Sequence, residues 1–348
     1  MRIVYGVSGE GFGHSSRAKE MISYLEKKGH KVLVVTYGQA YSILKEQFNV
    51  LKIEGIHLYF ENGKMAFLKT LFKGLVPTSI NMVNFFKIRK AIKKFSPDIF
   101  ITDFEPFTAM ISYSLRKPII TIDNQHRLTQ LEIKIPWKYL ASYWITRIAV
   151  AFNPPWADAH IILSFTKQKT ALKKAHLVCP ILRKEIIQAK PKESKESNYI
   201  LVYQTKPNNP LVKILKQIKE NFIVYGYNKE KQEKNILFKK SGPHFIKDLA
   251  SCKAVIATSG FSLMSEALFL KKPMFVNPLK RQFEQTLNAL FLQRQELGEF
   301  SEEFTRENIE KFLKNAKTYK KNINKYKMNP NEAFATTERI LKHLCPED

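Results

Sequence analysis

Short apolar runs alternate with amphipathic runs along both halves of the chain, and this pattern restricts the possible folds more than any other sequence feature. In the first half it predicts strands at 2–7, 31–36, 98–102 and 118–122, with helices at 15–28 and 39–47. In the second half it predicts strands at 199–203, 222–226, 235–239, 253–258 and 273–277, with helices at 210–220, 244–251, 262–270 and 282–295. Alternating strands and helices build parallel sheets, so we expect an α/β fold with two doubly wound sheets.

A polar linker separates the two halves. The 348 residues suffice for two hydrophobic cores at about 150 residues per domain. Residues 189–198 are charged, polar and interrupted by proline, which is typical of a linker. We therefore expect a first domain at 1–190 and a second at 196–330. Helices predicted at 304–319 and 331–344 close the chain, and the segment 331–348 can pack back on the first domain.

The charge balance narrows the class of partner. Lys and Arg number 57 against 31 Asp and Glu, which gives a net charge of +26 and favours an anionic partner. Nucleic acid, anionic lipid and phosphorylated substrates all fit, but the sequence has no helix-turn-helix, zinc-finger or aromatic RNA-binding pattern. The three cysteines have no paired or metal-ligand spacing, which favours a reducing cytoplasm and argues against disulfides and a zinc site.

Much of the positive charge lies among apolar residues of the first half. No acidic residue occurs between Glu61 and Asp98, and large apolar residues interleave there with cations. The cations are Lys64, Lys69, Lys73, Lys87, Arg89, Lys90, Lys93 and Lys94. This composition, together with the aromatic residues Trp137 and Trp144, is typical of an interfacial segment that binds an anionic membrane surface. The alternative is a basic helix packed on its own sheet.

Residues 139–157 form the longest weakly charged stretch of the chain. It is interrupted by Arg147 and by Asn153-Pro154-Pro155, so it is too short for a spanning helix but can lie on a bilayer.

The first predicted strand leads directly into a glycine-rich turn, with Gly9, Gly11 and Gly13 followed by His14 and Arg17. Glycines allow a sharp turn and a close approach to a ligand, and the following helix N-terminus favours anions. The spacing is not the Gly-x-Gly-x-x-Gly of dinucleotide folds, and the second strand ends without an acidic residue. Nicotinamide binding is therefore disfavoured, whereas a tight turn with His14 capping the helix remains an alternative.

A second ligand-binding pattern follows the predicted strand at 253–258. Ser259 and Gly260 can admit a phosphate at the start of the next helix. Glu266 lies six residues after Gly260, where a carboxylate can accept hydrogen bonds from a ribose diol, although a solvated helix acid would look the same. Glu284 and Gln285 then present acceptors and donors suited to a sugar with several hydroxyl groups.

These motifs resemble those of GT-B nucleotide-sugar glycosyltransferases. The similarity is strongest to the lipid-linked N-acetylglucosaminyltransferases of peptidoglycan synthesis and to a related family of predicted glycosyltransferases of bacteria and archaea. It rests on Gly13-His14, on Gly260 with Glu266, and on Glu284-Gln285 before Asn288-Ala289. Tyr203 to Asn208 replace the glycine turn of the peptidoglycan enzymes, which also have Gln-Gln where this chain has Glu-Gln.

The resemblance implies two Rossmann-like domains that face a central cleft, with acceptor binding by the first and donor binding by the second. For the donor it implies Thr205, Ser259, Gly260, Phe261, Ser262, Glu266, Glu284 and Gln285. For the acceptor we expect Gly11, Gly13, Arg17, Asn124, Gln125 and His126. The implied donor is a nucleotide sugar, with uridine diphosphate as the expected nucleotide, and the implied acceptor is a lipid or a lipid-linked molecule.

Sugar transfer needs a base for the acceptor hydroxyl, and His14 suits that role because histidine titrates near neutrality. Asp103, at the end of a predicted strand, can orient His14, with Glu105 or Glu10 as alternatives. Asp103-Phe104-Glu105 has the look of a metal-binding pattern, but the resemblance implies no metal and no other cofactor.

The expected activity is thus metal-independent glycosyl transfer in the cytoplasm, at the inner face of the cytoplasmic membrane. A nucleotide-sugar hydrolase or epimerase of the same fold is the first alternative, and a basic nucleic-acid-binding protein is the second. The motifs select no nucleobase, sugar or acceptor.

Overall fold

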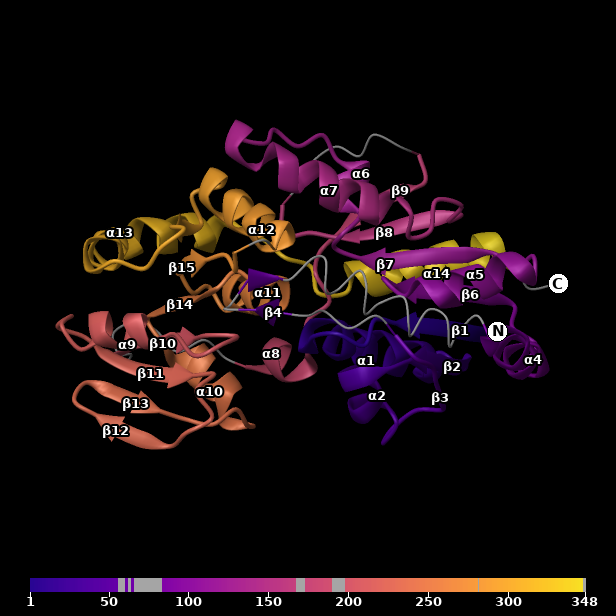
Figure 1. Cartoon of the computed structure of the whole chain (residues 1–348), viewed down its shortest axis with the longest axis horizontal. Coiled ribbons are helices and arrows are strands. Elements are labelled where there is room, and N and C mark those ends of the chain that lie inside the picture. The colour runs from indigo at the N-terminus through magenta and orange to yellow at the C-terminus, as the bar shows by residue number, and fades with distance from the viewer. Residues whose placement is uncertain are drawn as a thin grey trace. The chain divides into compact units, whose positions relative to one another are not determined.

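The computed structural model describes residues 1–55, 60–61, 64–65, 83–166, 173–189, 198–280 and 282–346. The chain divides into two compact units (Figure 1). Unit 1 comprises Met1–Arg183 with Asn329–Asp348, and unit 2 comprises Lys184–Met328. The division precedes the linker expected at 189–198 because α8 (Lys184–Gln188) contacts α10 (His244–Ser251) of unit 2. Residues 190–197 of that linker lie outside the described part of the chain.

Unit 1 is built on a seven-stranded parallel sheet with the order β3-β2-β1-β6-β7-β8-β9. Its strands are β1 (Arg2–Val7), β2 (Lys31–Thr36), β3 (Val50–Lys52), β6 (Ile99–Asp103), β7 (Ile119–Asp123), β8 (Ala159–Leu163) and β9 (Ala175–Val178). The four strands that the sequence predicted are present within one residue of their expected bounds. A separate antiparallel pair is formed by β4 (Phe60–Glu61) and β5 (Lys64–Met65).

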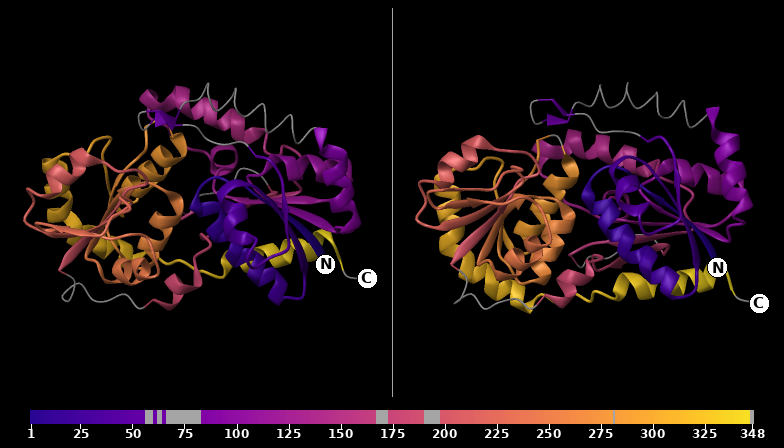
Figure 2. Two further views of the ribbon diagram at one scale, coloured as in Figure 1. Left: turned by 60° about the horizontal axis from the view of Figure 1, so that its bottom comes forward. Right: turned by 90° about the horizontal axis from the view of Figure 1, so that it is seen from below.

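Helices cover both faces of this sheet (Figure 2). They are α1 (Phe12–Lys27), α2 (Gly38–Leu44), α4 (Phe85–Lys94), α5 (Pro106–Ser114), α6 (Arg127–Gln130), the 3-10 turn η1 (Trp137–Tyr139), α7 (Leu140–Ala151) and α14 (Glu332–Leu344). Every residue of β6, β7 and β8 is buried, as expected for parallel strands covered on both faces. Ile92 of α4 and Ile111 of α5 share one core with Phe100, whereas α14 packs against β8 and β9.

Unit 2 repeats the plan with the strand order β12-β13-β11-β10-β14-β15-β16, in which only β12 is antiparallel to its neighbour. The strands are β10 (Tyr199–Tyr203), β11 (Asn221–Tyr225), β12 (Lys231–Glu233), β13 (Ile236–Phe238), β14 (Ala254–Thr258), β15 (Met274–Asn277) and β16 (Gly298–Phe300). The helices besides α8 and α10 are α9 (Asn209–Leu215), α11 (Phe261–Phe269), α12 (Phe283–Arg294) and α13 (Arg306–Lys325). Phe222, Phe275 and Phe312 lie in the core of this unit.

Each sheet reverses its winding direction at one strand. In unit 1, β1 lies between β2 and β6, and in unit 2, β10 lies between β11 and β14. Chain connections leave such a strand in opposite directions, so a crevice opens at the carboxyl ends of the two adjacent strands, where α/β proteins bind ligands. The glycine-rich turn follows β1 and the Ser259-Gly260 turn follows β14, so the topology positions both sequence motifs at these points.

Unit 2 also buries a lysine side chain outside these turns. Lys272, directly after α11, is only 2% exposed. Burial lowers the pKa of Lys272 to about 8; nearby Cys252 opposes this shift and Lys320 adds to it. The folded protein therefore binds this proton less tightly than the unfolded chain does, so the ammonium group destabilises the fold below pH 8, and this cost disappears as the pH rises toward the ordinary lysine pKa.

We predict that Lys272→Met stabilises unit 2 against denaturant, by up to about 3 kcal/mol at pH 7, because it removes a buried charge. The gain should shrink steadily when unfolding is measured between pH 8 and pH 10. Lys271→Met is the matched control: Lys271 donates to the carbonyl oxygens of Ile323 (3.2 Å) and Tyr326, so its removal should destabilise the protein. A loss of stability in Lys272→Met at every pH would contradict this account.

Candidate active site

The glycine-rich turn places the start of α1 at the carboxyl edge of the unit 1 sheet. Gly11 is the N-cap of α1 and has φ +83°, a conformation that favours glycine, and a Cβ there would meet nothing within 4 Å. Gly9 packs so closely on Tyr37 that a Cβ would lie 2.3 Å from its ring. As a result α1 begins at Phe12, three residues earlier than predicted, and its first turn contains His14.

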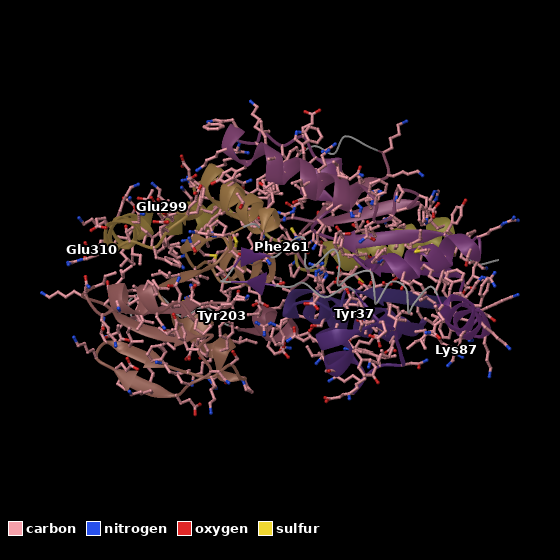
Figure 3. All side chains as sticks on the ribbon, viewed as in Figure 1. Tyr37, Lys87, Tyr203, Phe261, Glu299 and Glu310 are labelled. Carbon is pink, nitrogen blue, oxygen red and sulfur yellow. The ribbon has the colours of Figure 1, made fainter. Side chains whose placement is uncertain are left out.

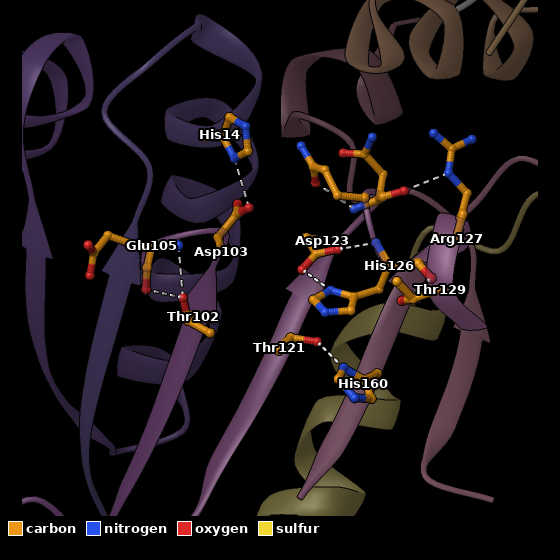
Figure 4. Close-up of polar contacts among 12 residues, drawn as sticks. His14, Thr102, Asp103, Glu105, Thr121, Asp123, His126, Arg127, Thr129 and His160 are labelled. Carbon is orange, nitrogen blue, oxygen red and sulfur yellow. Dashed lines mark hydrogen bonds and ion pairs between the residues drawn. The ribbon is translucent and has the colours of Figure 1, made fainter. Parts of the chain in front are cut away.

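His14 pairs with Asp103, the last residue of β6. Strands β1 and β6 pair with Val7 opposite Asp103, and the Ser8 amide donates to the Asp103 carbonyl oxygen at 3.0 Å. His14 Nδ1 lies 2.8 Å from Asp103 Oδ1 (Figure 4). The carboxylate is fully buried, whereas the histidine side chain is 15% exposed. With its proton on Nδ1 donated to Asp103, His14 carries a lone pair on Nε2, the state required of a general base.

This geometry also decides between two interpretations of His14. No side chain caps the N-terminus of α1, so His14 does not cap the helix. The predicted partner Asp103 is the carboxylate that His14 contacts.

Arg17, which the sequence predicts to contact the acceptor, is buried beside this pair. Its Nε donates to Asp103 Oδ2 at 2.6 Å, its Nη2 donates to Asp103 Oδ1, and its Nη1 donates to Asn124 Oδ1 at 2.7 Å. Burial alone would raise the pKa of Asp103, but the charges of Arg17 and His14 and their hydrogen bonds outweigh it and hold that pKa below its usual value. Asp103 is therefore an ionised carboxylate in the interior.

Asn124, Gln125 and His126, also expected to contact the acceptor, form a buried turn after β7. Asn124 accepts from Arg17, and the Gln125 side chain accepts from the Asn124 amide at 3.2 Å. His126 Nδ1 lies 2.7 Å from Asp123 Oδ2, and its amide donates to Asp123 Oδ1 at 2.9 Å. All three side chains thus have partners inside unit 1, and their contact with an acceptor stays a prediction.

A further histidine, missed in the sequence, lies beneath this turn. His160 of β8 has its ring centroid 4.6 Å from that of His126, and its Nδ1 lies 2.9 Å from Thr121 Oγ1. Burial is the main cause that lowers the pKa of His160 to about 4, so this ring is neutral at neutral pH. Thr121 and Asp123, two residues apart on β7, lie on one face of the sheet, and Thr121 is in register with His160 of β8. The sequence alone does not reveal this pairing because it depends on the register of the two strands.

Glu105, an alternative partner for His14, has a structural role. Its carboxylate caps α5 by accepting from the amides of Phe107 at 2.9 Å and Thr108 at 2.7 Å. Burial raises its pKa in spite of these hydrogen bonds. The hypothesis that Glu105 orients His14 is wrong because both carboxylate oxygens bind the helix N-terminus. Glu10, the other alternative, is half-buried. Its charge is a minor cause, after burial, of the raised pKa of Tyr37.

In unit 2, hydrogen bonds hold the turn after β14 from two sides. Thr205 Oγ1 lies 2.8 Å from Thr258 Oγ1, and Asn288 of α12 donates to the Ser259 carbonyl oxygen at 2.9 Å. Ser259 is fully buried, and its Oγ has no hydrogen-bond partner among the described residues. A Cβ on Gly260 would meet nothing within 4 Å, and no side chain caps α11.

The start of α11 therefore has the properties of an anion site. The first amides of a helix lack partners within the helix, and here a buried hydroxyl and an open glycine accompany them. Phe261 is the buried first residue of α11, labelled in Figure 3, and Ser262 is half-buried.

Two carboxyl residues and one amide residue complete the predicted donor set. Glu266 is only 5% exposed, so it is not a solvated helix acid. Glu284 is half-buried in the first turn of α12. Gln285 donates to Gln282 Oε1 at 2.8 Å and accepts from the Leu279 amide at 3.0 Å, so its side chain holds the turn before α12.

Within the described ranges, no group of three or more His, Cys, Asp and Glu side chains is arranged to hold a metal ion.

The comparisons with known proteins agree with this architecture. Residues 1–317 match the model of Glycosyl transferase family 1, and the chain belongs to this family. No curated protein sequence matches the chain significantly. Similar solved structures include the glycotransferase of kitacinnamycin, with a TM-score of 0.72 and 13% identity over 99% of both chains. The calicheamicin glycosyltransferase CalG4 gives 0.72 and 14% over 99% of this chain and 100% of its own.

MurG of Acinetobacter baumannii is also similar, with a TM-score of 0.67 and 15% identity over 98% of this chain and 100% of its own. The predicted GT-B fold is thereby confirmed, and the protein is a glycosyltransferase.

Substitutions of Asp103 and of Glu105 should have different effects, the first on kcat and the second on stability. We predict that Asp103→Asn lowers kcat for sugar transfer by about 10³-fold, because the neutral amide neither fixes the tautomer of His14 nor stabilises its protonated form. Glu105→Ala should leave kcat within about twofold of the wild type but lower the free energy of unfolding by about 1–2 kcal/mol, the usual cost of a lost N-cap. A large loss of kcat in a folded Glu105→Ala variant would overturn this assignment.

Proposed function

We propose that this glycosyltransferase moves a sugar from a nucleoside-diphosphate donor to a hydroxyl group of a lipid or lipid-linked acceptor, without a metal ion. The observation that carries the proposal is the His14–Asp103 pair at the carboxyl edge of the unit 1 sheet. The choice of uridine diphosphate as the carrier rests on the resemblance of the donor motif to that of the peptidoglycan enzymes.

The chemistry follows from the pair. His14 Nε2 accepts the proton of the acceptor hydroxyl while the acceptor oxygen forms a bond to the anomeric carbon of the donor sugar. The bond between that carbon and the diphosphate oxygen breaks, and its electron pair stays on the departing nucleoside diphosphate. Asp103 stabilises the imidazolium that forms, and His14 then releases its proton to solvent.

Unit 2 supplies groups suited to the donor. The amides at the start of α11 and the unpartnered Ser259 hydroxyl can stabilise the negative charge of the diphosphate. Glu266, on the same helix, can accept hydrogen bonds from the ribose hydroxyls. Both carboxylates of Asp103-Phe104-Glu105 are already bound to His14, Arg17 and α5, which supports transfer without a metal at that motif.

One surface of unit 1 supports binding to a lipid bilayer. Helices α4, α5 and α7 contain no Asp or Glu, and we call their outer surface the acid-free face. Right-handed connections place α5 and α7 on the same side of the sheet, and α4 packs in the same core as α5. The exposed large apolar residues on or beside these helices are Val83, Phe86, Met110, Tyr113, Trp137, Leu140, Trp144, Ile145, Ile148, Phe152 and Trp156.

Exposed cations accompany them on α4: Lys87, marked in Figure 3, and Lys90, Lys93 and Lys94. Each lysine near an anionic leaflet contributes about 1 kcal/mol, and the exposed aromatic residues suit the headgroup region. In the described part of the chain no helix has the length and hydrophobicity needed to cross a bilayer. Of the interfacial segment predicted at 61–98, residues 62–63 and 66–82, with Lys69 and Lys73, lie outside the described residues.

We predict that Glu266→Ala weakens nucleotide-sugar binding by about 10- to 100-fold, the loss of one or two hydrogen bonds to a charged group. Thermal shift measures this directly, since a ligand at 100 times its Kd adds about 2.7 kcal/mol of stability. Glu266→Gln is the matched control and should retain part of the affinity. If no nucleotide or nucleotide sugar stabilises the wild-type protein while DNA does, the proposed donor is wrong.

His14→Ala should bind the donor as the wild type does but lower kcat by about 10²- to 10⁴-fold, because transfer loses its base. Binding isotherms and initial rates on the same preparation separate the two effects. Unchanged turnover in this variant would remove His14 from the mechanism.

For the acid-free face, we predict that Lys90→Glu with Lys94→Glu lowers sedimentation with anionic phosphatidylserine vesicles at least about tenfold. Trp144→Ser with Ile148→Ser should lower it as well. The control is Lys314→Glu with Lys317→Glu, an equal charge change on exposed positions of α13 in unit 2. Equal loss in the control, or no binding to anionic vesicles by the wild type, would contradict the membrane assignment.

A further inference from the structure

We propose that Arg17 is a positioning residue that orients His14 and balances the charge of Asp103, and that it links the His14–Asp103 pair to the turn after β7. The inference rests on the proposed role of His14 as the base. It gives Arg17, which the sequence suggested as an acceptor contact, a different task.

The first argument is geometric. Arg17 lies three residues after His14 on α1, so both side chains leave the same side of the helix. The planar guanidinium donates to both carboxylate oxygens of Asp103, from Nε at 2.6 Å and from Nη2. Such a bidentate contact fixes the plane of the carboxylate as well as its position. His14 Nδ1 bonds to the same carboxylate, so the ring takes its orientation from Arg17 through Asp103.

The second argument is electrostatic. A buried carboxylate with histidine as its sole cation would favour the protonated ring, since the charged pair is stabilised where water is excluded. Here Arg17 already compensates the charge of Asp103, and its Nη2 lies 2.9 Å from His14 Nδ1. The charge that pairs with Asp103 in the interior is therefore supplied by Arg17, and the Asp103 carboxylate does not depend on a charged His14 ring.

Other ionisable groups around the pair do not replace this charge. Asp123 of β7 interacts with Arg17 and is itself bound to His126. Burial, with the charges of Asp103 and Asp123, raises the pKa of the Tyr5 hydroxyl of β1 against a smaller lowering by Arg17, so this hydroxyl is neutral. Glu10 is a half-buried carboxylate in the turn after β1.

The third argument concerns the link to β7. Arg17 Nη1 donates to Asn124 Oδ1 at 2.7 Å, and Arg127 donates through Nε to the Asn124 carbonyl oxygen at 2.7 Å. Asn124 is therefore held from two sides, and Arg17 joins the carboxyl ends of β6 and β7. A displacement of the turn after β7 would move the guanidinium, and with it the carboxylate that orients His14.

The test is an NMR titration of the His14 ring in the full-length protein, which needs no substrate. In Arg17→Gln the midpoint of the titration should rise by about one pH unit or more, because the opposing charge is lost. In Arg17→Lys, which keeps the charge but not the fork, the midpoint should stay within about half a unit of the wild type. Arg89→Gln is the matched control: Arg89 bonds to Ser114, and its removal should leave the His14 midpoint unchanged.

Rates on the same variants test the orientation. Both Arg17 variants should lower kcat at least about tenfold while KM for the donor changes less than about twofold, because misplacing the base affects the chemical step. If Arg17→Gln does not fold, Arg17→Lys still tests the proposal, since a wild-type kcat in that variant overturns it. An unchanged His14 midpoint in folded Arg17→Gln also overturns it, whatever the activity. If the His14 midpoint shifts in Arg17→Gln but the wild-type protein transfers no sugar, the proposed function is refuted and the role of Arg17 stands.

Discussion

The ionised carboxylate of Asp103, buried between His14 and Arg17, is the interaction on which the organisation of unit 1 depends. A charge in the interior is tolerated only when it is paired and hydrogen-bonded, and both partners here come from the first two turns of α1. That requirement explains the sequence before them. Gly11 turns the chain directly into the helix, and the register of β1 with β6 places Asp103 beside the start of α1.

The two units apply one topology to two kinds of chemistry. Each has a position, at the carboxyl ends of β1 and β6 in unit 1 and of β10 and β14 in unit 2, where its sheet reverses its winding direction. In unit 1 this position is occupied by the His14–Asp103 pair, which we propose exchanges a proton with a hydroxyl group of the acceptor. In unit 2 it holds uncharged donors, the amides at the start of α11 and the buried Ser259 hydroxyl, which suit a negatively charged leaving group. Glycosyl transfer from a nucleotide requires a base and an anion site, and we propose that these two positions supply them.

Sequence periodicity predicted the central strands of both sheets because strands covered on both faces are continuously apolar and begin and end abruptly. His14, Asp103, Ser259 and Glu266 could be chosen because they follow strands or open helices. The partners of these residues could not. Arg17 binds Asp103 across 86 residues and Asn124 across 107, and nothing local distinguishes such an arginine from one that contacts a substrate. Glu105 was misjudged for the related reason that a capping carboxylate and an orienting one both follow a strand.

Analysis of the reaction product tests the central claim most directly. Purified protein, anionic vesicles that contain extracted membrane lipids, and a donor labelled in its sugar would be incubated together, and the label would be followed by mass spectrometry. The account predicts that one nucleotide sugar gives a glycosylated lipid and one equivalent of nucleoside diphosphate, and that both products disappear in the His14→Ala variant. Release of free or epimerised sugar with no glycosylated lipid would contradict it and identify a nucleotide-sugar hydrolase or epimerase on the same fold.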